Sequence, residues 1–415
     1  MFKQFFKCPL RVQSLREGPG GPLLEGFAKE LYEKGYSKIT ARRHIRAAEH
    51  IVYWTDRKGI QHSGLTENIL ERFDRHLDRC RCQGYGQTDR SDLLHGARLF
   101  LRHLRSTGVV TVSAAKTIDQ DPVLLVGFRK WMRQQRGTCD HTLCNYNPSI
   151  RELLIRLGED PSRFDAQSLR QFVLEKSQQS GWASAKKCTT ALRMFLRFLI
   201  VDGKCADDLD AAIPVLAHWR LSSLPRYLQE EEVERIIRTC DPSTPVGSRN
   251  RAILLLLARL GLRAGDIVQL RLGDINWKDA EIQVSGKGRR QTRLPLTQEV
   301  GDAVVGYLQY GRPQTDTDVL FVRSCAPFRG FSRGCAISAL VTQAMCRAGV
   351  SCQSRGAAHL LRHSAATSML RQGASLQDIA GVLRHRSIET TQIYAKVDVT
   401  ALRQIAQAWP EVQPC

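Results

Sequence analysis

Residues 359–394 read HLLRHSAATSMLRQGASLQDIAGVLRHRSIETTQIY, and the rest of the chain is organised around them. His359 and Arg362 are three residues apart, so on a helix they lie on the same face. Ser375 followed by Asp378 predicts a capping box that opens a second helix. The stretch therefore predicts consecutive short elements that deliver an imidazole, a guanidinium, a second imidazole and a phenol, in that order.

These side chains suit chemistry on a phosphodiester. An arginine fork matches two non-bridging phosphate oxygens, and histidines donate hydrogen bonds or move protons near neutral pH. A tyrosine hydroxyl attacks and becomes a covalent intermediate once its proton has an acceptor. A His-x-x-Arg pair also occurs by chance in basic helices, so this interpretation depends on motifs earlier in the chain.

The composition indicates a polyanionic partner. The 415 residues carry 61 Lys and Arg against 41 Asp and Glu, a formal net charge of +20, which favours nucleic acid first and an anionic membrane second. The longest apolar run, residues 252–258, is far too short to span a bilayer, and the basic N-terminus has no signal-peptide core. We therefore expect a nucleic-acid partner and no membrane span.

Thirteen cysteines are many, yet their spacing does not predict a metal site. There is no Cys-x-x-Cys pair and no matched Cys/His quartet, and Cys80 and Cys82 are closer together than in a usual zinc knuckle. Cys139, His141 and Cys144 lack a fourth ligand. We therefore expect reduced, mostly buried thiols and no bound metal.

The first half of the chain predicts an arm followed by two helical modules. Residues 1–21 are expected to form a flexible basic arm. Amphipathic patterns predict a first helical module in residues 22–116, with helices from residue 23 to about residue 108 and a linker over residues 109–116, and a second in residues 117–205.

The two modules share a spacing of apolar residues. Gly26 and Phe27 are echoed by Gly127 and Phe128, each pair opening an amphipathic helix. This similarity indicates duplication, or convergence on one helical pattern. Chance likeness between generic amphipathic helices remains an alternative.

The second half predicts a different kind of domain. Residues 206–223 are expected to be a linker, and a new domain is expected over residues 224–398. Residues 281–285 alternate like a strand, and residues 292–296 return after a basic turn. We expect a mainly α protein: helical N-terminal DNA-binding modules, then a domain that adds this β-hairpin to its helices, then a C-terminal helix and tail over residues 399–415.

Four motifs in this second half resemble those of one family, the tyrosine recombinases or phage integrases. They are GLRAGD with Arg263, GKGRRQTRLPL with Lys287, HLLRHSAAT with His359 and Arg362, and LRHRSIETTQIY with His385 and Tyr394. They stand in the family order at compatible spacing. The resemblance implies an α+β tyrosine-recombinase catalytic domain with a small three-stranded β-sheet. More loosely, it implies a core-binding domain in residues 117–205, with residues 22–116 as a possible first copy of it.

The resemblance also implies a reaction, the cleavage and rejoining of DNA through a 3′-phosphotyrosine with Tyr394 as nucleophile. Arg263 and Arg362 would clamp the equatorial oxygens of the transition state, where charge grows. Lys287 would protonate the departing 5′ oxygen as general acid. No cofactor is expected, because these cations supply the charge stabilisation that a metal ion gives elsewhere.

Three further residues are expected to support these groups. His359 would accept or relay the tyrosine proton, and His385 would hydrogen-bond a non-bridging oxygen. Asp266 would orient the guanidinium of Arg263.

One position departs from the family, which commonly has glycine before the last histidine. Arg384 stands there, at a cost of ~1 kcal/mol if the backbone must be left-handed, and it could reach DNA instead. Outside the catalytic set, the residues expected to contact DNA are Arg289, Arg290, Arg293, Arg384, Lys186 and Lys187.

The resemblance implies a site-specific recombinase or integrase of a bacterial mobile element or phage, a cytoplasmic, nucleoid-associated protein that binds double-stranded DNA and no membrane. It would act as a homotetramer on paired sites or with sister recombinases, because exchange between two duplexes needs four strand cleavages. Two alternatives remain: a type IB topoisomerase-like enzyme that uses the same chemistry, and a catalytically silent DNA-binding regulator of the same ancestry. The intact set of six catalytic residues argues against silence.

Overall fold

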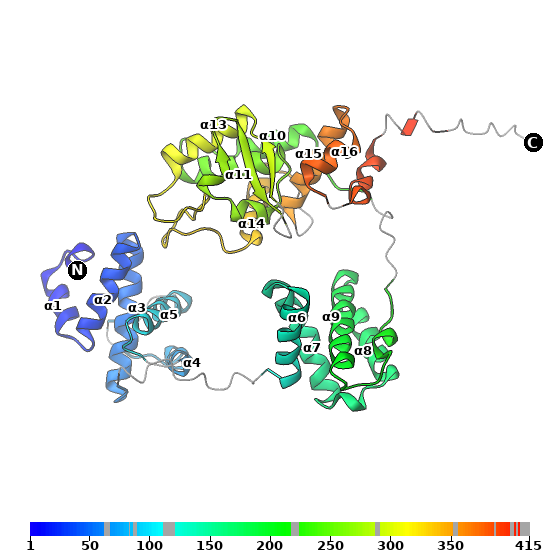
Figure 1. Cartoon of the computed structure of the whole chain (residues 1–415). Coiled ribbons are helices and arrows are strands. Elements are labelled where there is room, and N and C mark those ends of the chain that lie inside the picture. Colours follow the sequence, from blue (N-terminus) through cyan, green and yellow to red (C-terminus); the bar gives the residue numbers. More distant parts are fainter. Residues whose placement is uncertain are drawn as a thin grey trace, which may run out of the picture. The chain divides into compact units, whose positions relative to one another are not determined.

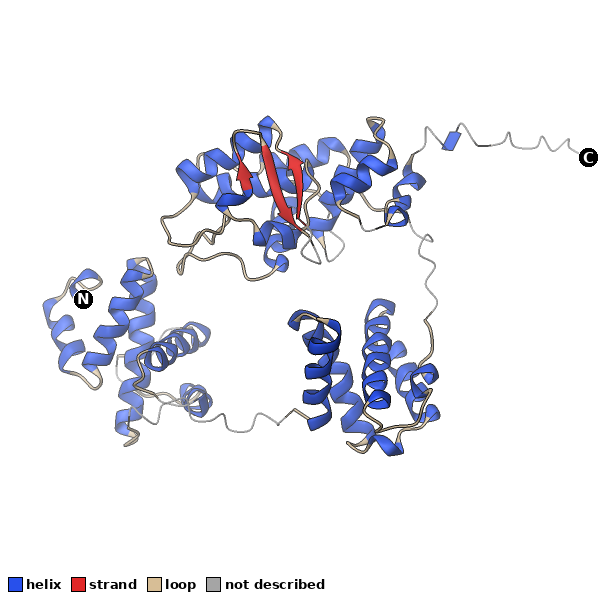
Figure 2. Ribbon diagram, in the orientation of Figure 1, coloured by secondary structure: helices blue, strands red, loops and turns tan. Residues whose placement is uncertain are grey.

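The computed structural model of the chain describes residues 1–61, 67–82, 84–85, 89–110, 121–216, 224–286, 291–351, 356–385, 387–398, 402–403 and 406. Its backbone divides into two compact units, Met1–Thr111 with Leu221–Cys415, and Val112–Arg220. Both are mainly helical, and in the described residues a small sheet lies in the C-terminal part of the first unit (Figures 1 and 2). The expected fold class is confirmed.

The N-terminal helical module contains α1 (Pro9–Glu17), α2 (Gly21–Glu33), α3 (Lys38–Arg57), α4 (Glu67–Leu77) and α5 (Arg90–Ser106). Helix α3 packs against α5, while α2 packs on α3 and α4 packs on α5. Their apolar faces meet in one core that includes Phe27, Phe73 and Phe100. The helices predicted from the apolar spacing are therefore confirmed.

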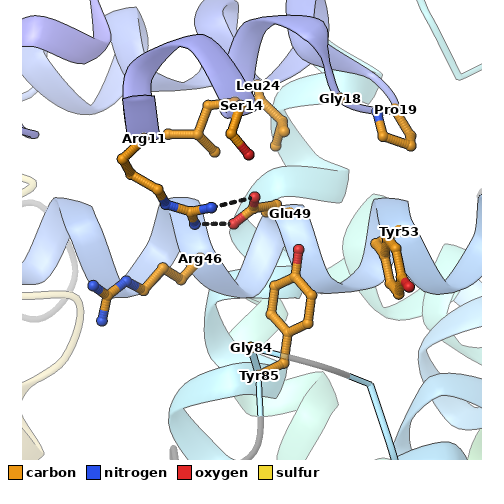
Figure 3. Close-up of a pocket in the computed structure, with 11 residues that line it drawn as sticks. Arg11, Ser14, Gly18, Pro19, Leu24, Arg46, Glu49, Tyr53, Gly84 and Tyr85 are labelled. Carbon is orange, nitrogen blue, oxygen red and sulfur yellow. Dashed lines mark hydrogen bonds and ion pairs between the residues drawn. The ribbon is translucent and has the colours of Figure 1, made fainter. Parts of the chain in front are cut away.

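The first residues belong to this core, so the expectation of a flexible basic arm is wrong. Phe2, Phe5 and Leu15 are at most 2% exposed, and Arg11 of α1 holds Glu49 of α3 in a two-pronged ion pair, with Nη1 and Oε1 2.9 Å apart (Figure 3). The basic side chains suggested an arm. Their charged ends stay in water, however, while the aromatic rings between them are buried, and this burial stabilises a folded segment.

The second helical module contains α6 (Val123–Arg136), α7 (Asp140–Leu157), α8 (Ala166–Gln179) and α9 (Trp182–Val201). Helix α7 packs against α9, as α3 packs against α5, and α8 packs on α9. Leu209 and Ile213 are buried in the same core, so this module extends past residue 205, where we expected it to end. The relation of the two modules by duplication stays a prediction.

The C-terminal domain is built around one buried helix, α11 (Pro245–Ala258). Its residues 252–257 are all 0% exposed, because the helix packs against elements on several sides. The elements around it are α10 (Glu230–Arg238), α12 (Ala264–Gln269), α13 (Gln298–Gly306), the π-helical turn η6 (Tyr307–Gly311), α14 (Gly334–Arg347) and α15 (Ala357–Arg371). After α15 come α16 (Leu376–Leu383) and the short 3-10 helices η7 (Ile388–Thr390) and η8 (Gln392–Val397).

The sheet of this domain is antiparallel, with the described strands in the order β1 (Ile275–Asn276), β2 (Glu281–Ser285) and β3 (Gln291–Pro295). Ile282 faces Leu294 across β2 and β3, and both side chains are buried. Arg293, whose side chain is 71% exposed, lies on the other face. The predicted hairpin strands and the three-stranded sheet are confirmed, whereas Lys287, Arg289 and Arg290 lie outside the described residues.

None of the described helices combines the length and the apolar character that crossing a bilayer requires. The described cysteines are all free thiols. Only Cys188 and Cys240 among them are buried, so the expectation of mostly buried thiols is wrong. Most of the others lie on the outer faces of helices or in loops, where packing does not enclose them.

Candidate active site

Helices α15 and α16 carry the motif that organises the sequence. His359 lies in the first turn of α15, with Arg362 one turn further along. Between the helices, Ser375 Oγ accepts from Asp378 N at 3.1 Å, and Ser375 N donates to Asp378 Oδ2 at 3.2 Å. The predicted capping box is confirmed, and it fixes where α16 begins.

The C-terminal end of α16 is where the two arginines meet. Arg263 Nη2 donates to the carbonyl oxygens of Leu383 (3.3 Å) and Arg384 (3.1 Å). Arg362 donates to the same Leu383 oxygen and to the carbonyl of Gly261. Carbonyls at the end of a helix carry partial negative charge, so they hold both guanidinium groups in place. A guanidinium has five N–H donors, so others remain for an anionic ligand.

Burial strengthens this cationic cluster. Arg362 is 5% exposed, and burial, with the nearby charge of Arg263, lowers its pKa to about 10. Burial also lowers the pKa of Arg263. Arg362 still carries its charge at pH 7, in surroundings where poor solvation makes an electrostatic interaction stronger than in water.

The close contact between these elements requires a glycine. Gly261 has a φ of 58°, and a Cβ atom there would lie 2.6 Å from Leu383 Cδ2. A side chain there would be strained by the left-handed backbone and would displace the Leu383 side chain, next to the Gly261 carbonyl that Arg362 binds.

The phenol of Tyr394, in η8, is buried beside the same helix end. Tyr394 is 1% exposed and packs with Ala366, Ile379 and Leu383. Its hydroxyl lies 2.8 Å from Nδ1 of His363. Burial raises the pKa of Tyr394 to about 12, so the hydroxyl keeps its proton at neutral pH until an acceptor takes it.

His363 is the functional residue that the sequence interpretation missed. We expected His359 to contact the tyrosine, but the contact is made by His363. Burial, followed by the charges of His359 and Arg362, lowers the pKa of His363, so its ring is neutral at pH 7 and one nitrogen can accept the tyrosine proton. The available signal was its place directly after Arg362, inside the quoted HLLRHSAAT motif, where we gave roles only to His359 and Arg362.

His385 lies just past the end of α16. Its Nδ1 is 2.8 Å from Oγ1 of Thr391, which is 0% exposed. Burial, followed by the charges of Arg362 and Arg263, lowers the pKa of His385 to about 4. A neutral ring that accepts from Thr391 at Nδ1 carries its proton on Nε2, and that N–H is then a donor for a phosphate oxygen.

His359 is placed differently. It is exposed, and among the described residues its ring makes no hydrogen bond. Partial desolvation by the surrounding protein, followed by the charges of Arg362 and Arg263, lowers its pKa. His359 is therefore near the arginines but does not touch the phenol.

Asp266 and Arg384 form a pair that the sequence interpretation did not foresee. Asp266 Oδ2 accepts from the backbone N of Arg263 at 2.9 Å and from the guanidinium of Arg384. Asp266 thus opens α12 and binds Arg384, instead of orienting the guanidinium of Arg263 as expected. The side chains of Arg384 and Asp266 are 6% and 7% exposed.

Arg384 therefore does not present a free surface to DNA, which corrects its expected role. Its φ of 54° and ψ of 50° are left-handed, as the family's usual glycine at this position suggested. The ion pair with Asp266 offsets the strain that a side chain has in this conformation.

The other residues expected to contact DNA remain predictions. Lys186 and Lys187 are exposed on the first turns of α9, and the Lys186 ammonium lies 4.9 Å from the Trp182 ring centre. Arg293 has an exposed guanidinium 3.5 Å from Glu281 Oε2.

A buried guanidinium group (Arg362), a half-buried one (Arg263), two neutral imidazoles and a protonated phenol thus converge on one helix end. Donors of this kind bind a phosphodiester, and a phenol beside a proton acceptor is a nucleophile for it. The class that this arrangement defines is an enzyme that transfers a phosphodiester to a tyrosine.

Comparison with known proteins agrees with this class. Residues 226–400 match the model of the phage integrase family. The integrase/recombinase y4rA of Sinorhizobium fredii is 35% identical, over 98% of this chain and 99% of its own length. The tyrosine recombinase XerD of Vibrio vulnificus is 30% identical, over 66% of this chain and 90% of its own length. This chain belongs to the phage integrase family, the tyrosine recombinases, and it is a site-specific DNA recombinase.

Solved structures show the same fold. The XerH site-specific recombinase bound to a palindromic difH substrate, a post-cleavage complex, matches with a TM-score of 0.55 and 19% identity over 82% of this chain and 95% of its own. A lambda integrase dimer bound to a COC′ core site matches with a TM-score of 0.53 and 18% identity, over 70% and 98% of the two chains.

Proposed function

We propose that this chain cleaves and rejoins double-stranded DNA with Tyr394 as the nucleophile. The observation that carries the proposal is the 2.8 Å contact between the Tyr394 hydroxyl and His363, beside the two arginines at the end of α16. The phenolic oxygen attacks phosphorus and its proton passes to His363. The bond from phosphorus to the 5′ oxygen breaks, that oxygen takes a proton from Lys287, and a 3′-phosphotyrosine remains.

The charge that develops on the phosphate is met by residues already held in place. Arg263 and Arg362 donate to the equatorial oxygens, and Nε2 of His385 donates to a non-bridging oxygen. His359, exposed at the start of α15, adds a donor from the solvent side. Rejoining reverses the step: a 5′ hydroxyl attacks the phosphotyrosine, so the energy of the broken bond is retained and no cofactor is required.

The burial of Tyr394 has a consequence for this reaction. A phenol that is 1% exposed does not meet a DNA phosphate without movement. We propose that the segment carrying Tyr394 shifts when DNA binds, while the capping box and the backbone contacts keep α16 and the arginines in position.

The test is covalent capture on a suicide substrate, a duplex nicked beside the cleavage site and analysed on a denaturing gel. Tyr394→Phe should still bind this DNA and form no adduct. The matched control is Tyr310→Phe, because Tyr310 belongs to the same domain and is 80% exposed; it should capture DNA like the unaltered protein. An adduct that persists in Tyr394→Phe would overturn the assignment.

The same substrate set separates the alternative activities. A type IB topoisomerase-like enzyme would relax supercoiled plasmid without a specific site and yield no recombinant product. A silent regulator would shift DNA on a native gel and yield neither adduct nor recombinant. A recombinase yields site-dependent adduct and exchanged strands.

We further propose that four protomers act together on two sites. One active site cuts one strand, and exchange between two duplexes needs four cleavages. The apolar pattern of Val399, Leu402, Ile405, Ala406 and Trp409 supports a partner contact, and Leu402 is 41% exposed.

Deleting residues from 399 onward should therefore leave single-site DNA binding nearly unchanged and remove cooperative assembly and recombination. A gel-shift titration on one-site and two-site DNA, with recombination scored in parallel, measures both. Normal recombination by the truncated chain would contradict the proposed contact with a neighbour.

We propose that the target sites lie on a bacterial mobile genetic element, and that the enzyme acts in the cytoplasm at the nucleoid, where such DNA is found. The support is the relatives named as integrases over nearly the whole chain. Sequencing the genomic neighbourhood tests this proposal: element ends or sister recombinase genes are expected there, and a neighbourhood without either would count against it.

A further inference from the structure

A compact group of two imidazoles and two thiols lies in the N-terminal helical module, in the part of the chain that the catalytic function does not use. His50 comes from α3 and His76 from the last turn of α4, while Cys80 and Cys82 follow α4. One ligand atom from each of the four lies within 4.8 Å of the others. The group therefore joins α3 to α4 and to the segment after it.

The distances match a tetrahedral site. Cys80 Sγ is 3.4 Å from His50 Nε2, and Cys82 Sγ is 3.5 Å from His76 Nε2. A zinc ion with Zn–S of about 2.3 Å and Zn–N of about 2.0–2.1 Å sets its sulfur and nitrogen ligands about 3.6 Å apart. Closing the remaining pairs around an ion requires side-chain shifts on the order of 1 Å.

The imidazole rings are fixed before any ion binds. The His50 side chain is 0% exposed and its ring stacks on Tyr85 at 4.5 Å and 8°. The His76 ring stacks on Trp54 of α3 at 5.3 Å and 23°. Rings held in this way present their Nε2 atoms to the thiols with little freedom left to lose, which favours binding of a ligand between them.

We propose that His50, His76, Cys80 and Cys82 bind one zinc ion that stabilises the N-terminal helical module. Two thiolates and two imidazoles form a set that suits Zn²⁺. Four protein ligands complete a tetrahedron and leave no position for water or substrate, so the site is structural and not catalytic. Zinc binding releases the two thiol protons to solvent, because thiolates are the ligands.

The sequence spacing concealed this set. His50 precedes His76 by 26 residues, and the two thiols are separated by a single residue, which is shorter than the usual spacing of zinc motifs. Only the packing of α4 beside α3 brings the first histidine to the other three residues. This proposal replaces our expectation that the chain binds no metal, and it is independent of the proposed DNA chemistry.

The experiment uses the full chain, purified under reducing conditions without an affinity metal. Elemental analysis should find one zinc per chain. Exchange with Co²⁺ should give the visible absorption of a tetrahedral ion together with thiolate charge-transfer bands. Zinc at well below one per chain, with no Co²⁺ spectrum, would overturn the proposal without any variant.

Variants then locate the site. Cys80→Ser combined with Cys82→Ser should abolish the cobalt spectrum and the bound zinc. Cys139→Ser combined with Cys144→Ser is the matched control, because both of these thiols are exposed in the second module, and it should keep both signals. His76→Cys replaces the imidazole with a thiolate, which is also a zinc ligand, and should keep the metal with a stronger charge-transfer band. Metal retained by the Cys80/Cys82 double variant would place the ion elsewhere and overturn the assignment.

Stability gives a third readout. Removal of zinc with a strong chelator should lower the thermal midpoint of the N-terminal module by about 5 °C or more and should not change the midpoint of the Cys80/Cys82 double variant. An unchanged midpoint in the unaltered chain would contradict a structural ion. The rate of covalent capture by Tyr394, measured below the midpoint, should be unaffected, which separates failure of this proposal from failure of the proposed function.

Discussion

Two clusters of histidines in this chain differ in what surrounds them. His363 and His385 lie beside the guanidinium groups of Arg263 and Arg362. In the N-terminal module, His50 and His76 lie beside the thiols of two cysteines. The guanidinium groups repel a cation and attract a phosphate, whereas thiols lose their protons and bind a soft metal ion as thiolates. The imidazole is the same in both, and its neighbours decide its ligand.

The clusters also differ in how they are held. The arginines of the catalytic cluster are fixed by backbone carbonyls at the end of α16. The rings of the N-terminal cluster are fixed by stacking on Trp54 and Tyr85. A site that binds and releases an anion keeps its own donors partly satisfied, while a site that holds an ion permanently relies on that ion to complete it.

Removing a cation from the catalytic cluster should have the largest effect, and it tests whether the two clusters work independently. Arg362→Ala should slow covalent capture by about 10²- to 10³-fold, as the loss of one preorganised donor does elsewhere, and leave the zinc content unchanged. The measurement is single-turnover cleavage of the suicide substrate. Arg371→Ala, at the exposed end of the same helix, is the control and should cleave at the normal rate. A loss of less than tenfold in Arg362→Ala would show that the phosphate charge is met elsewhere.

The pH dependence of the cleavage rate tests the role of His363. Burial, His359 and Arg362 hold the pKa of His363 below its usual 6.5, so the ring accepts the tyrosine proton at neutral pH and loses that ability only as the pH falls below about 6.5. The cleavage rate should be flat near pH 7 and decline toward acid. His363→Gln should lower the rate by about 10² and lose that acid limb. The pH is varied in the single-turnover assay with DNA saturating. A His363→Gln profile that still declines on the acid side would assign the proton to another group, His359 first.

A lowered histidine pKa also makes the stability of the fold depend on pH. His385 has a folded-state pKa of about 4, below the ordinary value of 6.5, so the unfolded chain binds more protons between these values. Stability should therefore fall as the pH is lowered from about 6.5 toward 4.

The smallest expected effect concerns the backbone at the end of α16. Arg384→Ala removes the pair with Asp266 and keeps a side chain in a left-handed conformation. Arg384→Gly removes the pair and relieves the strain. Both variants should be destabilised, and the glycine variant by about 1 kcal/mol less. Urea unfolding of the two variants measures the difference, and equal stabilities would mean that the backbone at this position stores no strain.

The motifs themselves could be read from the sequence. The family order of the boxes around Arg263, Arg362, His385 and Tyr394 predicted which residues meet, and all four are described close to the end of α16. The capping box at Ser375 and the hairpin strands were also readable, because a local pattern decides each of them.

What the sequence concealed depends on long-range packing. Whether the Tyr394 hydroxyl meets His359 or His363 depends on how η8 crosses α15, and Asp266 meets Arg384 because α12 and the end of α16 lie together. The buried aromatic residues at the start of the chain appeared to be part of a basic arm, because composition alone does not say what a phenylalanine packs against. The His50 cluster is the same kind of miss, since α3 and α4 must pack before its four ligands meet.

One carbonyl connects the charge and the nucleophile. The Leu383 oxygen accepts from Arg263 and Arg362, while the Leu383 side chain packs with Tyr394 in one cluster. A phosphate that binds the remaining donors of these two guanidinium groups therefore lies beside the residue that packs against the phenol. Such coupling is reciprocal: if bound DNA favours release of Tyr394 by some factor, a change that releases Tyr394 tightens DNA binding by the same factor. The affinity for uncleavable DNA then measures the free energy that keeps Tyr394 in its buried position.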